Sequence, residues 1–139
     1  MPLASVTIEA LRGKFYALVQ PFDVHPVYKR FATVPTHDGG PHVEHHGDVY
    51  AYVVTERGSE YERRETSDPD ELLYWLVSDT TGQAAQQFEL AHRVAGRDSR
   101  RLWFAKHVEL LENIRADWGN RKRDEYERVL KEHPYNDGA

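Results

Sequence analysis

Apolar residues recur at helical spacing near the start of the chain, between Val6 and Val19. These positions are Ile8, Leu11, Phe15 and Leu18, with Val19 beside them. The spacing puts them on one face of a helix. Ser5 or Thr7 can cap the first turn, and Pro21 stops the helix.

Prolines and glycines interrupt the pattern between residues 20 and 41. They predict an irregular connection, which leaves the structure of this segment open. A long loop without structure is uncommon inside a compact domain. We therefore expect its apolar residues to pack on the body of the protein, with a short helix or strand among them. They are Phe22, Val24, Val27, Tyr28 and Phe31.

A three-stranded antiparallel meander follows, with tight turns at His46-Gly47 and Arg57-Gly58. The predicted strands are residues 41–45, 48–56 and 59–66. Side chains alternate between the two faces of a sheet, so the pattern sorts them into two sets. The first set, expected to form the core, is Val43, Tyr50, Tyr52, Val54 and Tyr61. The second set is His42, Glu44, Val49, Ala51, Val53, Thr55, Glu60 and Glu62.

The second set has an apolar middle and an acidic rim, which is typical of a partner-binding patch. An ordinary half-buried sheet, or a second layer covering this face, would give the same pattern. A register shift of one residue would exchange the two faces.

Helical periodicity dominates the rest of the chain. Asp68-Pro69 is a strong helix start, and Gly96 is predicted to end this helix. Asp98 or Ser99 starts the next helix, which we expect to end at Gly119. Asn120 would cap a last helix that stops at Pro134, with residues 135–139 frayed. The predicted fold is a single α+β domain over residues 1–139: an N-terminal helix, a three-stranded meander and three C-terminal helices packed on the sheet.

Composition narrows the class of protein. The 139 residues include no cysteine, which excludes disulfides and thiol catalysis and suits a reducing cytoplasm. The N-terminal residues do not resemble a secretory signal, and no apolar run is long enough to cross a membrane. The net charge is −5. Residues 1–92 carry 7 basic and 14 acidic side chains (net −7), and residues 93–139 carry 11 and 9 (net +2).

This charge distribution argues against a nucleic-acid ligand and favours a basic partner. The acidic residues concentrate between positions 56 and 71. The one basic stretch, Arg121-Lys122-Arg123, is interleaved with acids, as on an ordinary solvated helix. A nucleic-acid-binding accessory domain that uses this helix remains a third hypothesis.

Two groups of polar residues could carry chemistry. His37, His42, His45 and His46 lie within ten residues and could bind a metal ion, although a regular strand points His42 and His45 to opposite faces. In the C-terminal helices, the helical spacing places several ionisable side chains on or beside the apolar faces, where a charged group needs a partner. We expect a structural network in which Arg100 or His107 pairs with Asp79 or Glu89, while Glu89 also pairs with Arg93 four residues later.

Three segments resemble a known family of bacterial proteins. They are ELLYWLVSDTT (71–81), FELAHRVAGRDSRRLWFAKHVELLENI (88–114) and EHPYND (132–137). The chain is similar to the polymorphic-toxin immunity proteins of family 63 from the meander to the tail, except that His107 stands where the family pattern has glutamine. The resemblance implies a cytoplasmic protein without catalytic activity or cofactor that binds and neutralises a toxin domain. It also implies a structural polar network at the junction between two helices, formed by Arg93, Asp98, Arg100 and Arg101.

The function predicted from the sequence is neutralisation of a toxin through an acidic surface, which would suit the basic cleft of a nuclease. The expected partner-binding residues are Glu44, Val53, Thr55, Glu60, Glu62, Asp70 and Glu71. The alternative is a metal-binding protein or small enzyme that uses the histidine group. The identity of the toxin and the oligomeric state stay open.

Overall fold

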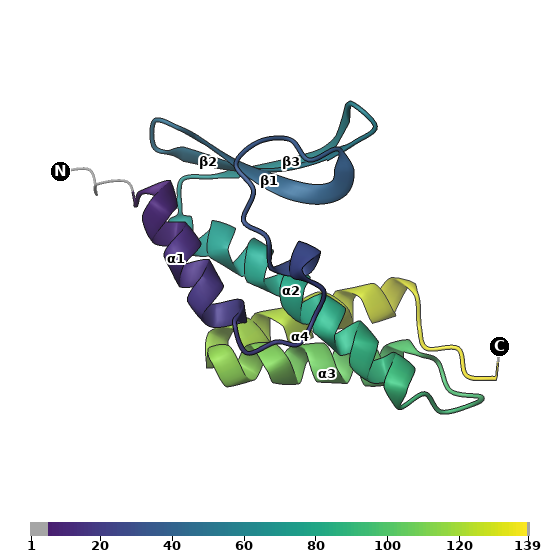
Figure 1. Ribbon diagram of the computed structural model, residues 1–139. Coiled ribbons are helices and arrows are strands. Elements are labelled where there is room, and N and C mark those ends of the chain that lie inside the picture. Colours follow the sequence, from purple (N-terminus) through teal and green to yellow (C-terminus); the bar gives the residue numbers. More distant parts are fainter. Residues whose placement is uncertain (1–5, 139) are drawn as a thin grey trace. The chain divides into compact units, whose positions relative to one another are not determined.

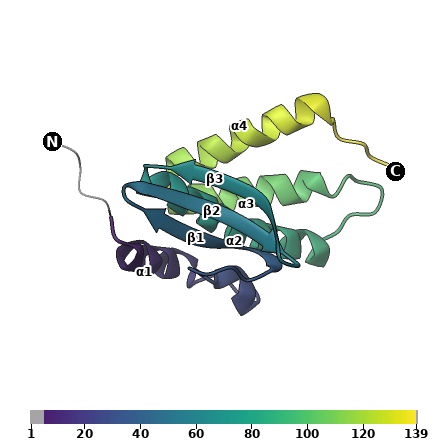
Figure 2. The ribbon, with the colours of Figure 1, turned by 90° about the horizontal axis from the view of Figure 1, so that it is seen from above.

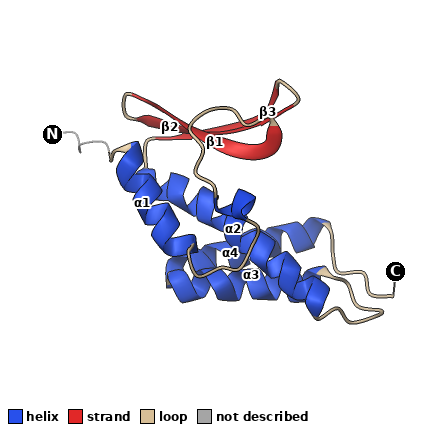
Figure 3. Cartoon of the chain, in the orientation of Figure 1, coloured by secondary structure: helices blue, strands red, loops and turns tan. Residues whose placement is uncertain are grey.

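The computed structural model describes residues 6–138 and has the predicted α+β order of elements. Helix α1 (Ile8–Val19) precedes a 3₁₀ turn, η1 (Pro26–Lys29), and strands β1 (Asp38–His46), β2 (Val49–Glu56) and β3 (Ser59–Thr66). Helices α2 (Pro69–Ala91), α3 (Arg100–Ile114) and α4 (Ala116–Glu132) follow (Figures 1 and 3). The chain divides into two compact units, residues 6–21 with 25–77 and residues 22–24 with 78–138.

In the first unit, local signals determine where α1 begins and ends. The side chain of Thr7 accepts a hydrogen bond from the amide of Ala10 at 3.1 Å, so Thr7 is the cap. Leu11, Phe15 and Val19 form the buried face, as predicted. The Phe15 ring lies 5.9 Å from that of Phe31, which anchors the irregular segment after α1 in the core of this unit.

The antiparallel sheet has the order β1-β2-β3 (Figure 2). Arg57 and Gly58 both have positive φ, as a type I′ turn requires, and Gly47 with a φ of 62° opens the other turn. That turn is Gly47-Asp48, one residue later than predicted, because His46 pairs with Val49.

One face of the sheet packs against helices. Tyr52 makes an edge contact with Trp75 of α2 at 6.2 Å, and the hydroxyl of Tyr50 donates to the carbonyl of Val6, just before α1. Val43, Tyr50 and Tyr52 are buried, so the prediction of a core face is confirmed for them. Figure 1 shows α1 and the first turns of α2 on this same side of the sheet.

The second unit consists of the later part of α2, α3 and α4. Helix α3 ends at Ile114, and Arg115 takes an extended conformation before α4 begins at Ala116. The prediction that Gly119 ends a helix and Asn120 caps the next is therefore wrong. Both lie inside α4, where Gly119 allows close approach to α3: a Cβ on it would lie 2.6 Å from the Cβ of Glu112.

Residues 136 and 138, in the tail that the sequence predicted to be frayed (135–139), make hydrogen bonds, and residue 139 lies outside the described residues. The amide of Asn136 donates to the carboxylate of Asp98 at 2.9 Å, and the amide of Gly138 donates to the carbonyl of Gly96 at 2.8 Å. Arg100 donates to the carbonyls of His133 and Pro134. Within the second unit, the tail is therefore joined to the connection between α2 and α3.

Candidate partner-binding surface

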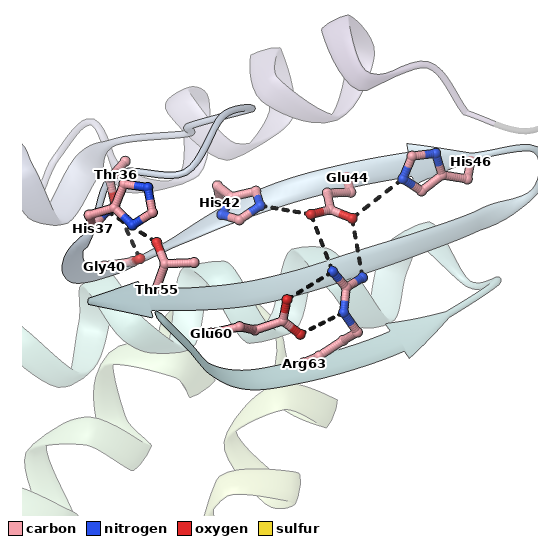
Figure 4. A network of polar contacts seen from close by, with 9 residues as sticks. All are labelled: Thr36, His37, Gly40, His42, Glu44, His46, Thr55, Glu60 and Arg63. Atoms are coloured by element: carbon pink, nitrogen blue, oxygen red, sulfur yellow. Dashed lines mark hydrogen bonds and ion pairs between the residues drawn. The ribbon is translucent and has the colours of Figure 1, made fainter. Parts of the chain in front are cut away.

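Three charged side chains form a bridge across the face of the sheet that points away from α1 and α2. Arg63 on β3 donates to Glu44 on β1 at 3.1 and 3.4 Å. The same guanidinium donates to Glu60 at 2.8 and 3.2 Å. One arginine thus holds two carboxylates in place (Figure 4).

The strand register explains why these side chains meet. His42 and Arg63 are the cross-strand neighbours of Val53, and Glu44 and Glu65 are those of Ala51. Directly paired residues share a face, and alternation places this row opposite the one that contacts Trp75. The charged side chains of the two outer strands therefore flank the small apolar residues of β2. We call Glu44, Glu60, Arg63 and Glu65 the acidic face.

Hydrogen bonds lower the pKa of two carboxylates of the acidic face, those of Glu44 and Glu60. Bonds from His42, at 2.9 Å, and from Arg63 lower the pKa of Glu44 to about 2. The bond from Arg63 also lowers the pKa of Glu60, while the two carboxylates raise that of Arg63. Together with Glu65, the acidic face holds three carboxylates and one guanidinium, so its formal charge is negative.

A β-bulge changes the predicted faces of β3. Thr55 pairs with Glu60 but Val54 pairs with Glu62, so Tyr61 is the extra residue. The prediction that Tyr61 belongs to the core face is wrong, since it is 66% exposed. Glu62 lies on the opposite face from Glu60, where it pairs with Arg64 at 2.7 Å. Arg64 in turn lies 4.2 Å from the ring centroid of Tyr52.

The other predicted partner-binding residues take different positions. Val53 and Thr55 share the acidic face but are buried, at 0% and 6% exposure, so they support this surface from within. The Thr55 hydroxyl accepts a hydrogen bond from the amide of His37 at 3.1 Å. Asp70 and Glu71 lie in the first turn of α2, the helix that packs on the other face of the sheet.

The four clustered histidines do not converge. His42 and His46 both contact Glu44, at 2.9 and 3.4 Å, whereas His45 stacks on Tyr50 on the opposite face. Across residues 6–138, no three histidine, aspartate or glutamate side chains gather in a way that could hold a metal ion. In Figure 4, His42 and His46 contact different carboxylate oxygens of Glu44, while His37 lies beside Thr55.

Polar contacts in the second unit differ in part from those expected. Glu89 and Arg93 form the predicted pair at 2.8 Å. Arg100 pairs with Asp98 at 2.8 Å, and Arg101 with Asp137 at 2.9 Å. Asp98, Arg100 and Arg101 thus connect the start of α3 to the tail, whereas Arg93 pairs with Glu89 at the end of α2.

His107 is buried among α2, α3 and α4 with neutral partners. It contacts the carbonyl of Ser78 at 3.1 Å, the hydroxyl of Thr81 at 2.9 Å and the hydroxyl of Tyr126. Burial, reinforced by the charge of Lys122, lowers the pKa of His107 to about 3. Asp79 acts electrostatically on Lys122. These contacts make His107 a structural group of the helical unit.

A second surface feature escaped the sequence analysis. A groove of about 360 Å³ lies between α3 and α4, with Phe104, Val108 and Leu130 among its apolar lining. Carboxylates at its rim are paired within the same unit, Glu109 with Lys106 and Glu112 with Arg123. Helical spacing alone does not reveal the groove, because it depends on how two helices cross.

Comparison with known proteins gives one result. The model of the family described as Immunity protein 63 matches residues 46–128, which is more than half of the chain and runs from the end of β1 into α4. No curated protein and no solved structure matches the chain. Among residues 6–138, no helix combines the length and the apolar composition that a membrane span needs.

Proposed function

The chain belongs to the immunity protein 63 family, and from this premise we propose that it binds and neutralises a cognate bacterial toxin domain through its acidic face. It would act as a stoichiometric inhibitor in the cytoplasm, without catalysis of its own. We choose this surface because Arg63 forms a bridge that holds Glu44 and Glu60 side by side.

This bridge supports binding because its carboxylates are already positioned. A side chain that is held before association loses less conformational freedom when the complex forms. Glu60 remains 45% exposed although it is paired, and a carboxylate has lone pairs for further donors. A basic partner can thus add hydrogen bonds to these carboxylates without rearranging them.

The charge of the surface favours a toxin with a basic cleft. Nucleases have such clefts because they bind phosphate backbones. An acidic inhibitor surface would complement that cleft, accelerate association and exclude the nucleic-acid substrate. We therefore propose a nuclease toxin whose cleft is occluded by the acidic face.

Co-expression tests the function itself. We would express the toxin domain encoded beside this protein with and without it, and measure growth and co-purification. Rescue of growth together with a stable complex is the expected result. A folded protein that neither rescues growth nor co-purifies would refute the proposal.

Two matched substitutions test the surface. Glu60 and Glu62 lie on the same strand, have 45% and 47% side-chain exposure, and each pairs with one arginine. They differ in the face that they occupy. Glu60→Lys should slow association with the toxin by about tenfold or more at low salt, whereas Glu62→Lys should slow it by a clearly smaller factor. Equal effects of the two substitutions, or none, would exclude the acidic face.

A further inference from the structure

The bulge in β3 presents one large aromatic side chain to solvent. Tyr61 is 66% exposed, although the strands around it bury most of their apolar residues. It falls between the pairs Thr55–Glu60 and Val54–Glu62, where the regular alternation is broken. Bulges at sheet edges often re-aim a side chain, and β3 is an edge strand of this sheet.

The surroundings of Tyr61 are charged. The residues before and after it are each fixed by an ion pair, Glu60 with Arg63 and Glu62 with Arg64. Charged side chains along an edge strand discourage pairing with another strand. At this edge, β3 therefore offers a partner a side chain, not its backbone.

A tyrosine in this setting has the properties of a binding anchor. Tyrosine is enriched among the few interface residues that contribute most binding energy, since it buries a large ring and still has a hydroxyl to hydrogen-bond. Such anchors lie within a ring of less important contacts that exclude water. Here Glu60, next to Tyr61 in β3, would belong to that ring, together with Glu44, which Arg63 links to Glu60.

We propose that Tyr61 is the anchor through which the protein engages its toxin, inserting its phenol ring into a pocket whose mouth carries lysine or arginine side chains. Those cations meet Glu60 and Glu44 as the ring enters. This inference rests on the proposed function and deepens it, because it names the residue at the centre of the contact and the kind of pocket that receives it.

The test measures the affinity of the full-length protein for the toxin domain by calorimetry or surface plasmon resonance. Tyr61→Ala should raise Kd by about 30-fold, the effect expected for an interface hot spot. Tyr61→Phe keeps the ring and should retain most of the affinity. Tyr16→Ala is the matched control, because Tyr16 is also exposed, at 44%, but lies on α1.

An increase in Kd of less than tenfold for Tyr61→Ala, or an equal loss for Tyr16→Ala, would overturn the anchor role. Hydroxyl-radical footprinting of the unmodified protein adds a measurement that needs no variant: the Tyr61 ring should be protected in the complex, and an unprotected ring would overturn the inference. If the unmodified protein does not bind the toxin at all, the proposed function fails instead, so the two failures are distinguishable.

Discussion

The imidazole of His107 lies so close to Gly82 that a Cβ placed on Gly82 would be 3.2 Å from Cε1 of His107. A glycine inside a helix normally costs about 1 kcal/mol relative to alanine. Here it provides the space for a ring that three hydrogen-bonding partners hold in place. Gly82, which lowers the helix propensity of α2, is thus required by the packing of His107 from α3.

Gly82→Ala should therefore destabilise the protein although it improves helix propensity. The ring cannot move aside without losing its bonds to Ser78 or Thr81, so overpacking should outweigh the gain by about 1 kcal/mol. Urea denaturation measures the difference. Gly13→Ala is the control, because Gly13 lies within α1 and a Cβ on it would have no atom within 4 Å. This substitution should raise the free energy of unfolding by about 1 kcal/mol. Equal stabilisation by both substitutions would contradict this account.

The buried imidazole should also make stability depend on pH. The native pKa of His107 is lowered to about 3, from an ordinary value of 6.5. Between these values the unfolded chain binds the proton and the native protein does not, so stability is full above pH 6.5 and falls as the pH decreases toward 3. Linkage gives a loss of about 2 kcal/mol between pH 7 and pH 5.

His107→Gln separates this effect from that of other groups. Glutamine cannot titrate, so the variant should lose less stability than the unmodified protein over the same two pH units. Denaturation midpoints at pH 7, 6 and 5 provide the comparison. Parallel pH profiles for the two proteins would show that His107 is not the group responsible.

Gly119→Ala should be more damaging than Gly82→Ala. A Cβ at this position would lie 2.8 Å from the backbone Cα of Glu112, so a helix must move and not only a side chain. We expect the free energy of unfolding to fall by about 2–3 kcal/mol, which is at the upper end of the range for overpacked sites. The exposed neighbour Asn120 is the control. Asn120→Ala should change the free energy of unfolding by less than about 0.5 kcal/mol. A tolerated Gly119→Ala would argue against the close crossing of α3 and α4.

Asp98 should control the order of the C-terminal tail. Its carboxylate accepts from Arg100 and from the amide of Asn136, and these bonds hold its pKa well below the usual range. Asp98→Ala removes them and should accelerate hydrogen exchange at Asn136 and Gly138, measured by mass spectrometry. Asp117→Ala is the control, since Asp117 also pairs with an arginine but has no bond to the tail. Unchanged exchange in Asp98→Ala would mean that other contacts hold the tail.

Elements that depend on neighbouring residues could be predicted from the sequence. The cap of α1 at Thr7, the turn at Arg57-Gly58 and the start of α2 after Asp68 each follow from the preferences of a few adjacent residues. The pair Glu89–Arg93 also follows from local spacing, because its members are four residues apart. The α+β order of elements could be predicted as well, since each element has its own periodicity along the chain.

Only the tertiary structure decided which residues share the candidate surface. The bulge that moves Glu62 to the other face and exposes Tyr61 comes from the pairing of β3 with β2, and one unpaired residue reverses the alternation beyond it. Gly82 and Gly119 owe their roles to residues on other helices. Periodicity records which side of an element is apolar, but not what lies against it, because that depends on how elements distant in the sequence pack together.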